Sequence, residues 1–154
     1  MRIGFIGLGN VGGKLAKNRL NNQFDLTVFD KNKEILNDFE LSGSKIASSI
    51  TQLVRNTDLI ITCLPSPEVC AEVLESNIGI INSIQEGQIW MEMSTTDEEQ
   101  LKKHAAMIEE KKAIALEAPV SGGCHRAATG NISIFVAGNR EGFEKALPIL
   151  KCLG

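Results

Sequence analysis

Three glycines near the start of the chain, Gly7, Gly9 and Gly12, have the spacing G-x-G-x-x-G. In dinucleotide-binding loops the first glycine permits a tight turn, the second lets the backbone approach a pyrophosphate, and the third lets a helix pack close to a strand. The amides at the start of that helix then face the phosphates. An apolar run precedes these glycines and a helix-like segment follows them. The pattern predicts a pyrophosphate-binding loop, made of Gly7, Leu8, Gly9, Asn10, Val11 and Gly12.

An acidic residue, Asp30, ends the next apolar run. A carboxylate at this place can accept hydrogen bonds from both hydroxyls of an adenosine ribose and repels a 2′-phosphate. We therefore expect NAD as the cofactor, in preference to NADP. The adjacent Lys31 weakens this preference, because its charge would partly neutralise an added phosphate. The alternative is a structural glycine turn followed by a solvated aspartate.

Three further stretches, residues 63–67, 93–97 and 117–123, each follow an apolar run and introduce Pro, Ser, Thr or Gly. Ligands of open α/β sheets bind beyond the carboxyl ends of the strands. These stretches are therefore candidates for the same ligand site. Each of them is equally consistent with ordinary caps and turns.

The elements that would position these residues follow from an alternation of short apolar runs and longer amphipathic segments. The apolar runs are typical of strands buried on both faces of a parallel sheet. Predicted strands span 2–6, 25–29, 59–63, 88–93, 113–116 and 132–137, with a very short one at 45–47. Predicted helices span 11–21, 31–41, 50–56, 68–76, 97–112 and 140–153. This succession predicts an α/β fold with a doubly wound parallel sheet of the Rossmann type, in one dinucleotide-binding domain over residues 1–154.

The segment 97–112 shows how a helix is predicted. Leu101, Ala105 and Ile108 recur at helical spacing and form one apolar stripe that would lie on a sheet. Thr95 or Thr96 is expected to cap its first turn. The helix predicted at 140–153 contains Pro148, which is expected to act as a kink or a fresh start.

Composition and charge argue against several classes of protein. The 154 residues carry a formal net charge of -3, which argues against nucleic acid or an anionic membrane as the partner. No apolar run reaches the roughly 18 residues of a membrane-spanning helix, and the first residues lack the features of a signal peptide. The cysteines and histidines lack the spacing of a zinc site. We therefore expect a cytoplasmic protein with reduced cysteines and no metal. Cys124 beside His125 suggests either thiolate chemistry or an ordinary cysteine next to a loop histidine.

Four motifs together resemble the β-hydroxyacid dehydrogenases, the family of 3-hydroxyisobutyrate dehydrogenase, tartronate semialdehyde reductase and 6-phosphogluconate dehydrogenase. The motifs are Gly4–Asn10, Leu64-Pro65, Ser94-Thr95 and Ala118–Gly123. The resemblance covers the whole chain and corresponds to the family's N-terminal nucleotide-binding domain. It implies that an all-helical second domain would follow Gly154, and that the chain is the front part of a longer protein.

The resemblance also implies roles for individual residues. Leu64, Pro65 and Thr95 would line the nicotinamide half of the cofactor. Substrate binding would fall to Ser121, Gly122 and Gly123, which offer a hydroxyl and amides to a carboxylate, with Ser94 as an orienting hydroxyl. The family's catalytic lysine lies in the helical domain, so no catalytic residue is assigned to this chain.

Some positions depart from the family pattern. Glu92 and Glu117 stand where members usually carry Asp. Both keep the charge, and we expect the change to matter little. Arg126 is either a partner for a second acidic group of the substrate or a solvated charge near a turn.

The favoured hypothesis is an NAD-dependent dehydrogenase that transfers a hydride between the nicotinamide and a small 3-hydroxy acid. Without the catalytic lysine, these residues alone are expected to bind cofactor and to be inactive. With the helical domain present, the protein is expected to form a homo-oligomer. The alternatives are a non-catalytic nucleotide-binding module with a regulatory or adaptor role, and a relative that reduces imines.

Overall fold

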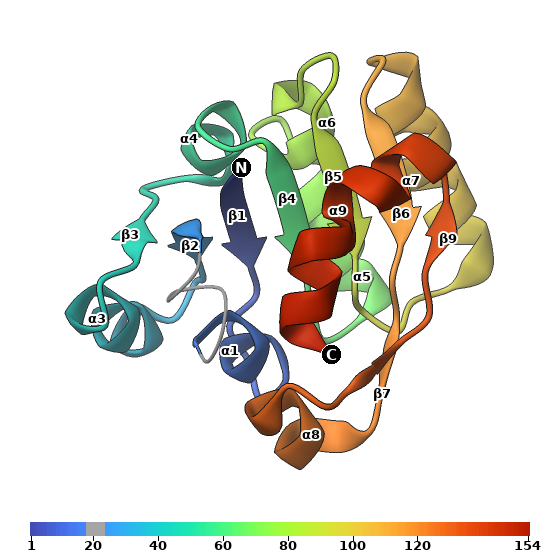
Figure 1. Ribbon diagram of the computed structural model, residues 1–154. Coiled ribbons are helices and arrows are strands. Elements are labelled where there is room, and N and C mark those ends of the chain that lie inside the picture. Colours follow the sequence, from blue (N-terminus) through green and yellow to red (C-terminus); the bar gives the residue numbers. More distant parts are fainter. Residues whose placement is uncertain (18–23) are drawn as a thin grey trace.

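The computed structural model describes residues 1–17 and 24–154. Within this part of the chain, seven strands form one sheet in the order β3-β2-β1-β4-β5-β6-β9 (Figure 1). Neighbouring strands are parallel, except that β9 runs antiparallel to β6. The strands are β1 (Arg2–Ile6), β2 (Asp25–Phe29), β3 (Lys45–Ile46), β4 (Leu59–Thr62), β5 (Ile89–Glu92), β6 (Ile114–Glu117) and β9 (Ala137–Gly138). The order from β3 to β6 is that of a Rossmann sheet, so the predicted fold class is confirmed.

Helices cover both faces of this sheet (Figure 1). They are α1 (Gly12–Leu15), α3 (Lys33–Leu41), α4 (Ile50–Arg55), α5 (Pro67–Glu75), α6 (Ile80–Ser83), α7 (Glu98–Glu110), α8 (Gly123–Thr129) and α9 (Arg140–Leu153). One apolar layer holds side chains from α1, α3, α8 and α9, and the other holds side chains from α4, α5, α6 and α7.

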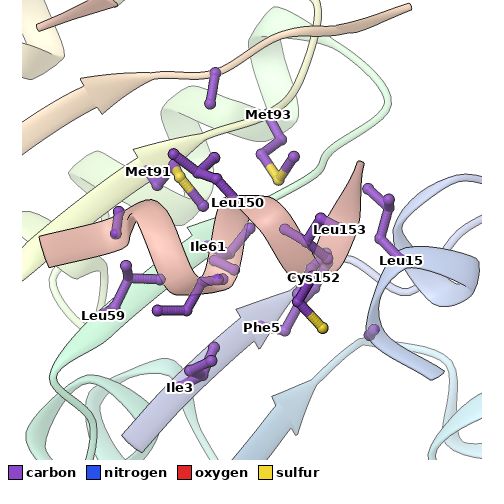
Figure 2. Packing of buried hydrophobic residues seen from close by; sticks show 14 of the residues in the cluster. Ile3, Phe5, Leu15, Leu59, Ile61, Met91, Met93, Leu150, Cys152 and Leu153 are labelled. Carbon is purple, nitrogen blue, oxygen red and sulfur yellow. The ribbon is translucent and has the colours of Figure 1, made fainter. Parts of the chain in front are cut away.

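The central strands explain why their sequences are apolar without alternation. Successive side chains of a strand point to opposite faces. Ile61 and Met91 therefore lie in the layer under α9, while Ile60 and Trp90 lie in the opposite layer. In Figure 2, side chains of α9 such as Leu150 lie over β1, β4 and β5. Because both faces are covered, every residue of β4 and β5 is buried.

Residues 132–137, predicted as one strand, instead contribute to two strands in different sheets. β8 (Ser133–Ile134) pairs antiparallel with β7 (Val120–Ser121), and β9 pairs with β6 at the edge of the main sheet. Pro119, just after β6, has no amide hydrogen with which to continue a ladder. The Phe135 amide, just after β8, donates a hydrogen bond to the carbonyl of Pro119, just before β7, at 3.0 Å.

Other differences from the prediction concern short elements and helix ends. α6, α8 and β7 were not predicted, because so few residues show no clear period. Thr95 or Thr96 was predicted to cap α7, but the capping residue is Asp97. The Asp97 side chain accepts a hydrogen bond from the Gln100 amide at 3.0 Å. α9 passes through Pro148 without a break. Of the helix predicted at 11–21, residues 18–21 lie outside the described part of the chain.

Candidate functional site: a cleft over the carboxyl ends of the strands

A cleft of about 960 Å³ lies where β1, β2, β4 and β5 end. Ile6, Phe29, Cys63 and Met93, at or just after those four strand ends, all line it. Its volume lies within the range of sites for cofactors and small molecules. The predicted residues at its border are Gly7, Gly9, Asn10, Val11, Gly12, Asp30, Lys31, Leu64, Pro65, Ser94, Thr95 and Gly123.

The glycines of this loop are needed for two different reasons. A Cβ atom on Gly12 would lie 2.1 Å from the Gly7 carbonyl oxygen, and one on Gly7, whose φ is 96°, would lie 2.3 Å from the Cys63 carbonyl oxygen. These two positions must therefore be glycine for the loop to close on itself. At Gly9, by contrast, no protein atom lies within 4 Å of such a Cβ. The open space at Gly9, on the cleft, fits a pyrophosphate that approaches the backbone closely.

Asp30 is tied to this loop by hydrogen bonds. Its Oδ2 accepts from the Leu8 amide at 2.7 Å, and its Oδ1 accepts from the Asn32 amide at 2.8 Å. The Leu8 side chain is buried in the core, so Leu8 contributes its backbone and does not line the cleft. Each carboxylate oxygen of Asp30 retains acceptor capacity. Asp30 is thus held half-buried at the border of the cleft.

At the other end of the cleft, Ser94 holds the loop that follows β4. The Leu64 amide donates to Ser94 Oγ at 2.7 Å, and the Ser94 amide donates to Glu92 Oε1 at 2.8 Å. Ser94 itself is 6% exposed. Its hydroxyl, predicted to orient a substrate, has a structural task in positioning Leu64.

Glu92 is the residue whose importance was underestimated from the sequence. Its side chain is 1% exposed. Burial raises its pKa, and the hydrogen bonds from Ser94 lower it by less. Glu117, which lies beside it in the β5–β6 register, is exposed. The signal for this difference was present in the sequence, because Glu92 interrupts the apolar run Ile-Trp-Met-Glu-Met. A carboxyl group in such a run must find its partners inside the protein.

The predicted anion-binding segment reaches the cleft only in part. Gly123 lines the cleft, whereas Ser121 and Gly122 do not. Ser121 is exposed and pairs with Ser133 in the small sheet formed by β7 and β8. Gly122, with a φ of 134°, precedes α8, which packs beside α1. The carboxylate-binding role of Ser121, Gly122 and Gly123 therefore remains a prediction.

Cys63 is the thiol that borders the cleft beside the glycine loop. Burial raises its pKa to about 12, with a further contribution from the negative charge of Glu92. A thiol with this pKa is neutral at pH 7 and is a poor nucleophile. Within the described residues, no group of three or more His, Cys, Asp or Glu side chains could hold a metal ion. No described helix is long and apolar enough to cross a membrane either.

A comparison with protein families gives one match over residues 2–154, to the NAD binding domain of 6-phosphogluconate dehydrogenase. The match spans the glycine loop, Asp30 and the three later motifs. The chain belongs to this family.

Its relatives are oxidoreductases. The mitochondrial 3-hydroxyisobutyrate dehydrogenase of Mus musculus is 35% identical over 152 residues, which are 99% of this chain and 45% of that protein. A solved structure of Psf3 in complex with NADP+ and 2-OPP is 27% identical, with a TM-score of 0.94 over 98% of this chain and 54% of that one. The chain thus spans about half the length of these relatives. The mouse protein is mitochondrial by name, so the predicted cytoplasmic location stays a prediction.

An imine reductase from a Pseudomonas species has the same fold. Its TM-score is 0.86 at 19% identity, over 99% of this chain and 52% of that one. A likeness at this level of identity shows the fold alone. NAD-binding dehydrogenases are therefore the class that family membership supports, and the substrate is a separate question.

Proposed function

We propose that this chain forms the cofactor-binding part of an NAD-dependent dehydrogenase of the β-hydroxyacid type. One observation carries the proposal: a single cleft is lined by Asp30 and the glycine loop, which follow β2 and β1, and by Leu64, Pro65 and Thr95, which follow β4 and β5 farther along the sheet. That order matches the two halves of a dinucleotide laid across the carboxyl ends of the strands. NAD in this cleft supplies a hydride acceptor.

Each end of the cleft has a distinct task in this proposal. The backbone at Gly9 leaves room for the pyrophosphate, and Asp30 accepts hydrogen bonds from the adenosine ribose. Leu64, held by Ser94, forms an apolar wall for the nicotinamide. Gly123, with Ser121 and Gly122 beside it, offers donors to the carboxylate of a small 3-hydroxy acid, such as 3-hydroxyisobutyrate or tartronate semialdehyde.

Oxidation of a hydroxyl group also needs a residue that accepts its proton, and such general base catalysis contributes about 10²–10⁴-fold. Among the described residues, Lys31 is the one lysine that lines the cleft, and it lies at the adenosine end. We infer that the proton-transferring group lies outside the described residues. The chain alone is then expected to bind cofactor and to leave hydroxy acids unchanged.

The same observation gives a second candidate some support. A cleft whose one lysine among the described residues lies at the end with Asp30 also suits a non-catalytic module that senses the nucleotide. Turnover, and not cofactor binding, separates the candidates. Calorimetric titration with NADH should show binding for both. A panel of 3-hydroxy acids, assayed for NADH production after a helical domain from a relative is appended, should show turnover for the dehydrogenase alone.

Turnover by the unextended chain at ordinary enzyme rates, mapped to a residue within it, would contradict the inferred division of labour. Absence of NADH binding would contradict the proposed function altogether.

A further inference from the structure

An ion pair lies among the residues that line the cleft, next to Asp30. Lys31 Nζ lies 2.9 Å from Glu72 Oε1. Lys31 follows β2, and Glu72 lies on α5, so the pair joins two segments that are 41 residues apart. Both side chains line the cleft.

The charges at this end do not favour an additional anion. Asp30, Lys31 and Glu72 are the charged side chains among the described residues that line the cleft. Two carboxylates against one ammonium leave a formal charge of -1. Lys31, which from its sequence position would be the natural partner of a 2′-phosphate, already has a carboxylate partner. Any phosphate there would have to compete with Glu72 for the lysine and would also meet the charge of Asp30.

We propose that Glu72 determines cofactor specificity. Its ion pair with Lys31 lowers the affinity of the adenosine end of the cleft for NADP(H) relative to its affinity for NAD(H). This inference rests on the proposed function, since it assumes that the adenosine lies between Asp30 and α5. The group that Glu72 disfavours is the 2′-phosphate, which carries about 1.5–2 negative charges at pH 7.

A purely structural role for this pair would predict something else. The Lys31 and Glu72 side chains are 71% and 59% exposed, and ion pairs at such exposure contribute little to folding. Removing Glu72 should therefore leave thermal stability almost unchanged. Its effect should appear in the ratio of the two cofactor affinities, and it should weaken as salt screens the charges.

The test is titration of the purified protein with NADH and with NADPH at low and high salt. In Glu72→Gln, the affinity for NADPH should rise about five- to tenfold while that for NADH changes by less than about twofold. Glu72→Lys should raise the affinity for NADPH further. In Lys31→Gln/Glu72→Gln most of the gain should disappear, because Glu72 acts through Lys31.

Glu86→Gln is the matched control. Glu86 pairs with Lys112 at 3.6 Å with similar exposure, 75% for the lysine and 72% for the glutamate. It borders a different hollow, with Arg2 and Asp58 at the amino ends of β1 and β4. The substitution removes the same charge and should leave the NADPH to NADH ratio unchanged.

The outcomes separate the two proposals. An unchanged ratio in Glu72→Gln, or an equal change in both affinities, with NADH binding intact, would overturn the role of Glu72. The same shift in Glu86→Gln would overturn it too, since net charge alone would then be the cause. If the unaltered protein binds neither cofactor, the proposed function itself fails.

Discussion

Two acidic residues at the carboxyl ends of parallel strands have opposite fates in this protein. Asp30, just after β2, is half-buried at the cleft and is held by the amides of Leu8 and Asn32. Glu92, the last residue of β5, is almost fully buried and accepts from the Ser94 amide. One carboxylate lines the cleft, and the other is internal and supports the Ser94 loop. Position at a strand end therefore does not identify a binding residue until the neighbouring strands and helices are known.

The same contrast separates the two ends of the cleft. The end after β2, which we propose holds the adenosine, presents charged, partly exposed groups, whose effects should appear mainly in cofactor affinity. The end after β4 and β5, which we propose holds the nicotinamide, is built on a buried chain of hydrogen bonds from Glu92 through Ser94 to Leu64. Substitutions there should act mainly on stability.

The largest expected effect lies in the glycine loop. Gly12→Ala places a Cβ 2.1 Å from the Gly7 carbonyl oxygen, so we expect a loss of about 3 kcal/mol or more in the free energy of unfolding and loss of NADH binding. Gly9→Ala meets no protein atom and should keep its stability while NADH binding falls. Denaturant unfolding and calorimetric titration of both variants provide the check. Equal destabilisation by the two substitutions would show that Gly9, like Gly12, is required by the fold, and would contradict its assignment to the ligand.

The next largest effect is expected at Glu92. Glu92→Ala removes a buried side chain and leaves the Ser94 amide without its acceptor, so it should cost about 2–4 kcal/mol of stability. NADH affinity should change less than stability, because Glu92 does not line the cleft. A large loss of affinity in a fully stable variant would contradict the scaffolding role.

Glu92 also predicts a pH dependence. Burial raises the pKa of Glu92 in the folded state above the ordinary value of 4.5. As the pH rises, the folded protein therefore keeps this proton to a higher pH than the unfolded chain does. Its contribution to stability is complete below about pH 4.5 and declines as the pH rises through the folded pKa. The free energy of unfolding of the unaltered protein should therefore fall relative to that of Glu92→Gln between pH 4 and pH 8, as measured by urea unfolding. A constant difference would show that the pKa of Glu92 is the same in the folded and the unfolded protein.

A smaller effect is expected at Asp30, and it should appear in affinity. A hydrogen bond to a charged group contributes about 1.5–3 kcal/mol, so Asp30→Ala should weaken NADH binding by about tenfold or more. The loss should be smaller for NADPH, whose 2′-phosphate the carboxylate repels. Calorimetry with both cofactors tests this expectation. Equal affinities in the unaltered protein, or no effect of the substitution, would remove Asp30 from the ribose site.

The smallest effect is expected from Ser94→Ala. It leaves the Leu64 amide without its acceptor and should cost about 1 kcal/mol of stability, with a modest loss of NADH affinity as Leu64 shifts. Thermal unfolding and titration measure the two effects together. If instead stability and NADH affinity are unchanged, and only turnover declines after a helical domain from a relative is appended, Ser94 acts on the substrate as the family resemblance implies.

The sequence predicted β1, β2 and α9 to the residue. Their patterns are self-sufficient, since an apolar run or an amphipathic stripe is bounded on both sides by polar or glycine residues. The single strand predicted at 132–137 was wrong, although polar and glycine residues bound it too, because its two halves belong to different sheets. Which partner each half takes depends on Pro119 and on the edge of β6, and neither is visible in the local pattern.

By itself, the sequence determined the succession of strands and helices, the glycine loop and the family, because these depend on residue types at short spacing. Only the tertiary structure decided what each acidic residue does. Asp30 became part of the cleft border because the Leu8 amide, in the loop after β1, donates a hydrogen bond to it. Glu92 became internal because strands lie on both sides of β5 and helices cover the sheet. Glu72 became part of the cleft because α5 brings it to Lys31 across 41 residues. Such contacts join groups that are distant along the chain, and only the packed sheet brings them within hydrogen-bond distance.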